Sequence, residues 1–203
     1  MRHIDITATK CIIFDFDGTL ANCTRLHQDA FRLAVETLLP GITYDEMAIE
    51  ALPTTEKMKR LRDDNRIEFD FAEFNRLKQQ ATMEGIGDYI HFREDLFDEL
   101  SRLYNWRIPL CVASNATQTF IHSSLRRMGV WDLFSKINTA TEMPAKPDPY
   151  TFVDCMNHFD ANARNTVIFE DSELGIASAR KVCKQVMAVA GVDSTIEHIR
   201  MIR

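Results

Sequence analysis

Four short runs of apolar residues, separated by longer amphipathic stretches, constrain the fold of this chain most strongly. They span residues 11–14, 109–113, 166–169 and 185–189. Each run is mostly apolar throughout instead of alternating apolar and polar residues, which is typical of strands covered on both faces. A further strand is predicted near 135–139. The pattern therefore predicts a parallel sheet in an α/β fold.

The stretches between these runs carry the apolar spacing of helices. Helices are predicted over 95–104, 117–128 and 173–183, the second stopped by Gly129. Asp148 and Pro149 are expected to be the N-cap and first residue of another helix. Strand and helix thus alternate, which predicts a sheet flanked by helices.

The stretch from about 23 to 88 differs, because it contains helical signals and no convincing strand. It is predicted to be a helical cap inserted into a catalytic core made of residues 1–22 and 89–203. Its helix signals lie at 26–39, at the capping box Thr43-x-x-Glu46, at 54–62 and from Asp70 onward. We expect Phe69, Phe71 and Phe74 to form the core of the cap, and Gly85 and Gly87 to be the hinge that leads back out of it.

Composition excludes several classes of function. The chain has 203 residues with 24 Lys and Arg against 30 Asp and Glu, a net charge of −6, and it lacks the basic stripe of a nucleic-acid-binding protein. The sequence contains no run of about 18 apolar residues, so no membrane span is predicted. The five cysteines are too scattered for a disulfide framework or a C-x-x-C metal site, so a reducing, cytoplasmic location is expected. The sequence leaves the oligomeric state open.

Two carboxylates, Asp15 and Asp17, follow the first apolar run directly. At the carboxyl end of a parallel strand they would enter the crevice where such sheets bind ligands. Asp15 could attack phosphorus, while Asp17 could protonate the leaving oxygen and then activate water. The alternative is that both residues only begin a solvated turn and cap the next helix.

Glu170 and Asp171 follow the 166–169 run in the same manner. Together with Asp15 they offer hard oxygen ligands suited to Mg²⁺. A divalent cation there would reduce the repulsion between a nucleophilic carboxylate and a phosphoryl group. The alternative is that the two residues cap the helix that follows.

Polar groups also follow the other strands. Ser114 and Asn115 come after the 109–113 run, where a hydroxyl and backbone amides could hold phosphoryl oxygens, although Ser114 could equally be an ordinary helix cap. Lys146 lies in a loop stiffened by two prolines, so its ammonium could be directed at the carboxylates. The alternative for Lys146 is an ordinary surface charge.

Together these segments resemble the four signature motifs of the haloacid dehalogenase-like superfamily of phosphohydrolases. The matching segments are Asp15-Phe16-Asp17-Gly18-Thr19, Ser114, Lys146-Pro147 and Phe169-Glu170-Asp171-Ser172. The resemblance implies a modified Rossmann core with an inserted cap and an aspartyl-phosphate intermediate on Asp15. It also implies that Asp17 is the acid and base, that Ser114 binds the phosphoryl group and that Lys146 steadies its charge. Mg²⁺ would be held by the Asp15 carboxylate, the Asp17 carbonyl and Asp171, with Glu170 at or next to the ion.

Within the superfamily the chain is most similar to the group of beta-phosphoglucomutases and small sugar-phosphate phosphatases. This similarity places His27 at the cap hinge near the acid, although His27 could also be an unremarkable polar residue at a helix start. Residues 52–56 offer no arginine for the second phosphate of a mutase substrate, and Glu50 precedes them. The function expected is therefore a Mg²⁺-dependent phosphatase acting on a small phosphorylated metabolite, a sugar phosphate or similar. The alternatives are a phosphosugar mutase and a non-catalytic relative that binds metal and phosphate.

Overall fold

The chain folds into two compact units. The computed structural model describes residues 6–49, 52 and 54–202. The core unit consists of Met1–Cys23 and Ile90–Arg203, and the inserted unit consists of Thr24–Tyr89. The described part leaves out residues 50, 51 and 53. The comparison with mutases above involves Glu50 and residue 53, so this part of it lies outside the described residues.

A five-stranded, fully parallel sheet forms the centre of the core unit, as predicted, with strand order β3-β2-β1-β4-β5. The strands are β1 (Cys11–Phe14), β2 (Leu110–Ser114), β3 (Phe134–Thr139), β4 (Thr166–Glu170) and β5 (Gln185–Ala188). Phe14 at the end of β1 pairs with Val112 of β2 and Phe169 of β4. The polar residues that follow these three strands therefore emerge at the same end of the sheet, where the carboxyl ends of the parallel strands lie.

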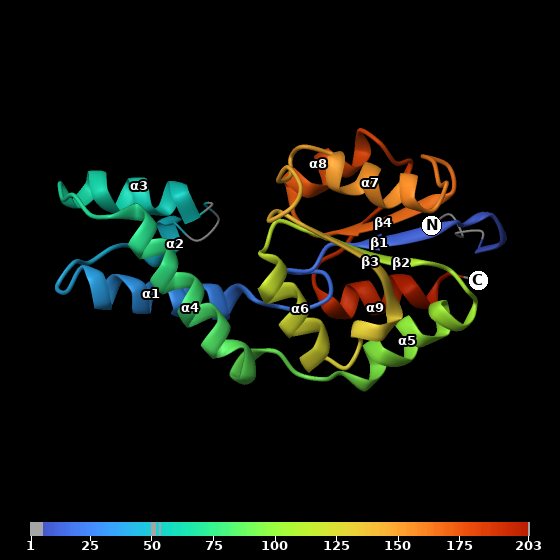
Figure 1. The fold of residues 1–203 in the computed structure, drawn as a ribbon, viewed down its shortest axis with the longest axis horizontal. Helices are drawn as coiled ribbons and strands as arrows, with labels where there is room; N and C mark the ends of the chain where they lie inside the picture. The colour runs from blue at the N-terminus through green and yellow to red at the C-terminus, as the bar shows by residue number, and fades with distance from the viewer. Residues whose placement is uncertain (1–5, 50–51, 53, 203) are drawn as a thin grey trace. The chain divides into compact units, whose positions relative to one another are not determined.

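Helices cover both faces of this sheet (Figure 1). One face carries α7 (Tyr150–His158) and α8 (Glu173–Arg180), and the other carries α5 (Glu94–Asn105), α6 (Gln118–Arg127) and α9 (Val192–Arg200). Two short 3-10 helices, η1 (Ile6–Ala8) and η2 (Trp131–Leu133), complete the unit. The alternation of strands and helices confirms the α/β prediction.

The predicted helix ends differ from the structure by a few residues, and α7 and α8 show why. Helix α7 begins at Tyr150 with Pro149 as its N-cap, one residue later than expected, but the Asp148 side chain still caps it as predicted, since its Oδ1 accepts a hydrogen bond from the Tyr150 N–H at 2.8 Å. Helix α8 ends at Arg180 instead of residue 183. Beyond it, Lys181 and Val182 donate their N–H groups to carbonyls three residues back, a tighter turn than the α-helix, and the Cys183 thiol donates to the Thr166 carbonyl of β4 at 3.1 Å.

The centre of the core unit is apolar because β1 is covered on both faces. All four residues of β1 have no exposed surface, and the Phe14 and Phe169 rings stack with centroids 4.8 Å apart. The five cysteines are free and buried. Four of them, Cys11, Cys111, Cys155 and Cys183, belong to the apolar cluster beneath α7 and α8.

The described residues of the inserted unit form helices joined by loops, with no strand among them. Its helices are α1 (Thr24–Leu38), α2 (Glu46–Ile49), α3 (Thr54–Asn65) and α4 (Phe71–Tyr89). Phe74 is fully buried in a cluster with Phe31, and Phe69 and Phe71 pack against this cluster, as the sequence predicted. Asp70 Oδ1 accepts hydrogen bonds from the N–H groups of Ala72 and Glu73 and so begins α4.

Two expectations for the inserted unit are wrong. The capping box is absent, because α2 begins at Glu46 and Asp45, not Thr43, accepts the hydrogen bond from the Ala48 N–H at 3.1 Å. Gly85 and Gly87 do not form a hinge, because both lie inside α4. A Cβ at Gly85 would lie 2.6 Å from Leu26 Cδ1, so this glycine lets α4 approach α1 closely. The link back to the core unit is the non-helical segment 90–93.

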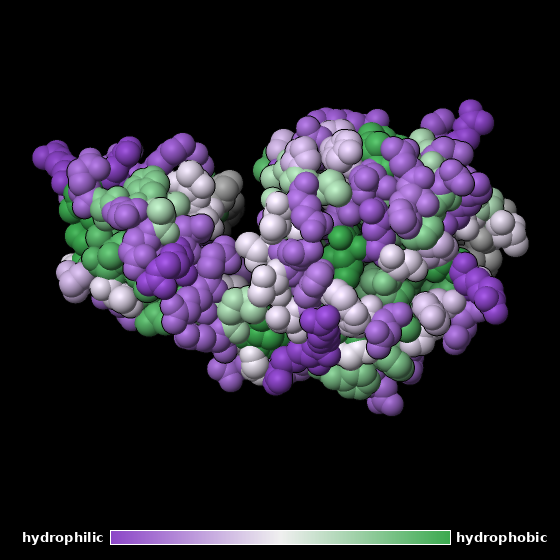
Figure 2. All heavy atoms as spheres, viewed as in Figure 1, coloured by the Kyte–Doolittle hydropathy of each residue, from purple (hydrophilic) through white to green (hydrophobic). Residues whose placement is uncertain are grey.

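Hydrophilic and hydrophobic atoms are interspersed over the visible face of each unit (Figure 2). Within the described residues, none of the helices has the length and apolarity that a bilayer crossing requires.

Candidate active site

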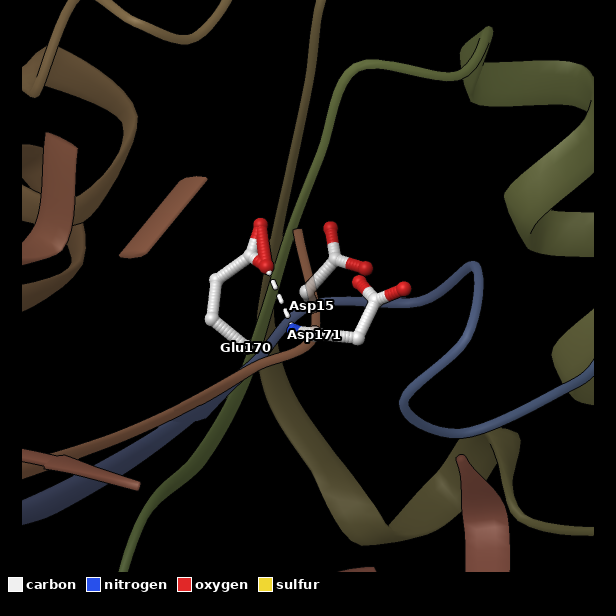
Figure 3. Close-up of side chains that lie close together, drawn as sticks. All are labelled: Asp15, Glu170 and Asp171. Carbon is white, nitrogen blue, oxygen red and sulfur yellow. Dashed lines mark hydrogen bonds between the residues drawn. The ribbon is translucent and has the colours of Figure 1, made fainter. Parts of the chain in front are cut away.

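Three carboxylates meet at the edge of the sheet where β1 and β4 end (Figure 3). Asp15, Glu170 and Asp171 each offer an oxygen, and these oxygens lie within 4.8 Å of one another. The backbone holds this arrangement, because the Asp15 N–H continues the β1–β4 pairing by donating to the Phe169 carbonyl at 2.9 Å. Asp15 and Glu170 are buried, whereas Asp171 is exposed. The structure thus brings together the carboxylates that the sequence placed at two separate strand ends.

Lys146 supplies a positive charge to this cluster. Its Nζ donates to Asp15 Oδ1 and to Glu170 Oε1, the latter at 2.9 Å, and its side chain is only 4% exposed. Burial lowers the pKa of Lys146, but the Asp15 and Glu170 carboxylates outweigh it, so the pKa lies above its ordinary value. The ammonium therefore stays charged at neutral pH.

The carboxylates still outnumber the cation. Burial raises the pKa of Asp15, as do the charges of Glu170 and Asp17, while Lys146 pulls it down. Burial also raises the pKa of Asp171 to about 6, and the Glu170 charge adds to the rise. A second cation would relieve this crowding, and three carboxylate oxygens form a donor set that suits Mg²⁺. The residues present therefore fit the predicted metal.

The loop after Asp15 packs directly against Asp171. Gly18 has φ +77°, donates its N–H to the Ala21 carbonyl at 2.7 Å, and leaves no room for a Cβ, which would overlap the Asp171 carboxyl group. A glycine at this position is thus required both by the left-handed backbone and by the close approach. Asp17 sits on this loop and accepts a hydrogen bond from the buried Cys23 thiol.

Glu170 is held by the start of α8. It accepts hydrogen bonds from the Asp171 N–H at 2.9 Å and from Ser172 Oγ at 3.2 Å. A Cβ at Gly175 would overlap Glu170 Oε1 and lie 2.7 Å from Oε2. The cap of α8 is Ser172, whose Oγ accepts from the Gly175 N–H, so the alternative of a Glu170–Asp171 cap does not describe this helix.

Ser114 and Asn115 lie at the end of β2. Ser114 is 3% exposed, and its Oγ accepts from the Ala116 N–H at 3.1 Å. The Asn115 side chain instead binds the backbone of Lys146, with Oδ1 accepting from its N–H at 2.7 Å and Nδ2 donating to its carbonyl at 3.1 Å. The sequence did not indicate this contact, because it joins two loops 31 residues apart.

His27 belongs to the inserted unit, in α1. Its Nδ1 lies 3.5 Å from Nζ of Lys78 in α4, and Lys78 is only 7% exposed. Sequence reasoning missed Lys78, although a signal was present. Lys78 interrupts the buried stripe Phe74, Lys78, Thr82 and Ile86, where a helical spacing of four predicts apolar residues.

Comparison with known proteins adds independent information. The family model described as haloacid dehalogenase-like hydrolase matches residues 12–189. The fructose-1-phosphate phosphatase YqaB of Escherichia coli is 26% identical over 174 residues, which cover 83% of this chain and 90% of that protein.

Two of the solved structures that share the fold show the extent of the similarity. CbbY from Rhodobacter sphaeroides, in complex with phosphate, superposes with a TM-score of 0.75 at 20% sequence identity. The match covers 90% of this chain and 87% of the CbbY chain. The beta-phosphoglucomutase of Clostridium difficile gives a TM-score of 0.72 at 20% identity, covering 93% of this chain and 92% of its own.

Proposed function

The chain belongs to the haloacid dehalogenase-like hydrolase family, and on this premise we propose that it is a Mg²⁺-dependent phosphatase of small phosphate monoesters. The observation that supports this most is the buried contact of Lys146 with Asp15 and Glu170, next to Asp171. Such a cluster can bind a phosphoryl group and a divalent cation at the same place.

In the first half of the reaction, an Asp15 carboxylate oxygen attacks the phosphorus of the ester. The bond between phosphorus and the ester oxygen breaks, and Asp17 gives its proton to the departing alcohol. The product on the enzyme is an aspartyl-phosphate at Asp15. The Lys146 ammonium, the Ser114 hydroxyl and the Asn115 backbone N–H hold the phosphoryl oxygens during the transfer.

In the second half, Asp17 takes a proton from water, and the resulting hydroxide attacks phosphorus. The acyl-phosphate bond breaks, inorganic phosphate leaves, and Asp15 returns as a carboxylate. The Mg²⁺ would be held by Asp15, Asp171 and the Asp17 carbonyl, with Glu170 alongside. When bound, it supplies positive charge that reduces the repulsion between the nucleophile and the phosphoryl oxygens.

The proposed substrate class is phosphorylated sugars or similar metabolites. The support comes from the relatives, since YqaB is named for fructose 1-phosphate and a further relative of 22% identity, from Thermotoga maritima, is a phosphorylated carbohydrates phosphatase. His27 and the inserted unit are proposed to contribute to the selection of substrate.

Asp15→Asn tests the proposal. We expect the wild type to release inorganic phosphate from p-nitrophenyl phosphate only with Mg²⁺, and the variant to release none while keeping its far-UV circular dichroism spectrum. Asp98→Asn, an exposed carboxyl of α5, is the matched control and should keep wild-type activity. Turnover by Asp15→Asn at the wild-type rate would refute the proposed nucleophile.

A sugar monophosphate, supplied with a small amount of its bisphosphate to phosphorylate the enzyme, separates the phosphatase from the two alternatives. A phosphatase accumulates inorganic phosphate, whereas a mutase of the beta-phosphoglucomutase type accumulates an isomerised sugar phosphate. A non-catalytic relative produces neither, although it would still bind Mg²⁺.

A further inference from the structure

One side chain holds the backbone of Lys146 at two points. Asn115 Oδ1 accepts a hydrogen bond from the Lys146 N–H at 2.7 Å, and Asn115 Nδ2 donates to the Lys146 carbonyl at 3.1 Å. A planar amide that satisfies both polar groups of one residue fixes the position and the direction of that backbone. The Lys146 residue is therefore anchored where its side chain begins.

The ammonium at the other end of that side chain lies in a confined place. It contacts Asp15 Oδ1 and Glu170 Oε1 and lies 5.3 Å from the centroid of the Phe152 ring. A lysine has a flexible four-carbon stem, so the ammonium stays at one place only if the backbone stays too. The loop is also held by exposed Lys181 Nζ, which donates to the Pro147 carbonyl at 3.1 Å, and by the Asp148 N–H, which donates to the Ala145 carbonyl at 3.1 Å. Among these contacts, those from Asn115 act on the backbone of Lys146 itself.

We propose that Asn115 is a positioning residue, whose side chain sets the place of the Lys146 ammonium beside the transferring phosphoryl group. This inference rests on the function proposed above for Lys146. Asn115 follows Ser114 directly, so one dipeptide at the end of β2 places both the Ser114 hydroxyl and the Lys146 ammonium. The side chain of Asn115 has no direct role toward substrate, and its backbone N–H keeps the role given above.

Asn115→Ala removes both hydrogen bonds. Because the charge of Lys146 matters most as charge develops on the phosphoryl group, we expect kcat to fall by about 10- to 100-fold, with KM changed less than about threefold. Affinity for orthovanadate, measured by calorimetry in the presence of Mg²⁺, should fall as well. Asn115→Asp keeps the acceptor but places an oxygen opposite the Lys146 carbonyl, so it should be at least as impaired.

Gln118→Ala is the matched control. Gln118 also carries an amide that joins the segment after β2 to the segment after β3, but it binds Glu142 Oε1 at 2.8 Å and not Lys146. Its kcat should equal that of the wild type within about twofold. Melting temperatures of all variants separate a loss of fold from a loss of positioning.

A double-mutant cycle with Lys146→Met decides the matter. If Asn115 acts through Lys146, Asn115→Ala should change kcat less than about twofold in the Lys146→Met background. If Lys146→Met turns over too slowly to assay, the same cycle is measured as orthovanadate affinity, with the same reduced effect expected. An equal loss in both backgrounds, or no loss in the wild-type background, overturns the inference while leaving the proposed function intact. Wild-type activity of Lys146→Met overturns the proposed role of Lys146 and the inference together.

Discussion

Gly175→Ala gives a sharp test of how the carboxylate cluster is built. Gly175 lies in α8, and alanine in a helix is ordinarily more stable than glycine by about 1 kcal/mol. Here, however, the added Cβ would overlap Glu170 Oε1 and Cδ. Glu170 is buried with 1% of its side chain exposed, so its carboxylate has to move deeper or sideways within a packed region.

The size of the effect follows from the contacts that Glu170 would lose. Ordinary carbon contacts need about 3.5 Å, so Glu170 Oε1 must retreat by about 2 Å. That movement disrupts the ion pair with Lys146, now at 2.9 Å, and the hydrogen bonds from the Asp171 N–H and Ser172 Oγ. Breaking a buried pair costs about 3–5 kcal/mol. Against the helix gain of about 1 kcal/mol, the free energy of unfolding of the core unit should fall by about 2–4 kcal/mol.

Gly87→Ala is the control, because Gly87 also lies inside a helix, α4, and a Cβ there meets no described atom outside its own helical turns within 4 Å. Urea denaturation followed by circular dichroism should show Gly87→Ala unchanged or stabilised by up to about 1 kcal/mol. Gly175→Ala should unfold at lower urea and lose about 10- to 100-fold in activity or Mg²⁺ affinity. If Gly175→Ala is as stable and as active as the wild type, the close packing of Glu170 on α8 is wrong.

Two further predictions concern the charges of the cluster. Lys146→Met leaves Asp15 and Glu170 without their buried cation, so the metal-free protein should lose about 3–5 kcal/mol of unfolding free energy in urea denaturation at pH 7; an unchanged midpoint would contradict the contact. The affinity for Mg²⁺ should fall as the pH drops through about 6, because burial raises the pKa of Asp171 to that value and a protonated carboxyl group is a poor ligand. Calorimetric titrations at pH 5.0, 6.0 and 7.5 check this, and equal affinities would rule out Asp171 as a ligand.

The sheet could be predicted because the amino-acid composition of its central strands indicates burial on both faces. Residues 11–14 and 166–169 are apolar on both faces, and the structure buries them on both faces. The last strand is a weaker case, since Gln185–Ala188 lies at the sheet edge and is only partly buried. A run of hydrophobic residues thus indicates a strand, but the order of strands depends on pairings that no single run contains.

The wrong predictions share a physical cause, because a local sequence signal does not show which other residue will contact or compete with it in the fold. Gly85 looks like a hinge in sequence, yet the close approach of Leu26 requires a residue without a Cβ there. Thr43 has the spacing of a cap, but Asp45 lies nearer the helix start and takes the hydrogen bond. The spacing of Lys78 within a buried helix face carried a usable signal, because a lysine at such a position needs polar groups nearby.

The position of Asn115 follows from the order of the strands. Lys146 comes after β3, and Asp15 comes directly after β1. Strand β2 lies between β3 and β1 in the sheet. The chain after β3 must therefore pass over the end of β2 before its lysine can reach Asp15. Asn115 is the first residue beyond β2, so it lies beneath that passage and can bind the backbone that crosses it. The same topology that gathers the carboxylates thus requires a contact at this point, and a side-chain amide there can satisfy both polar groups of the crossing residue.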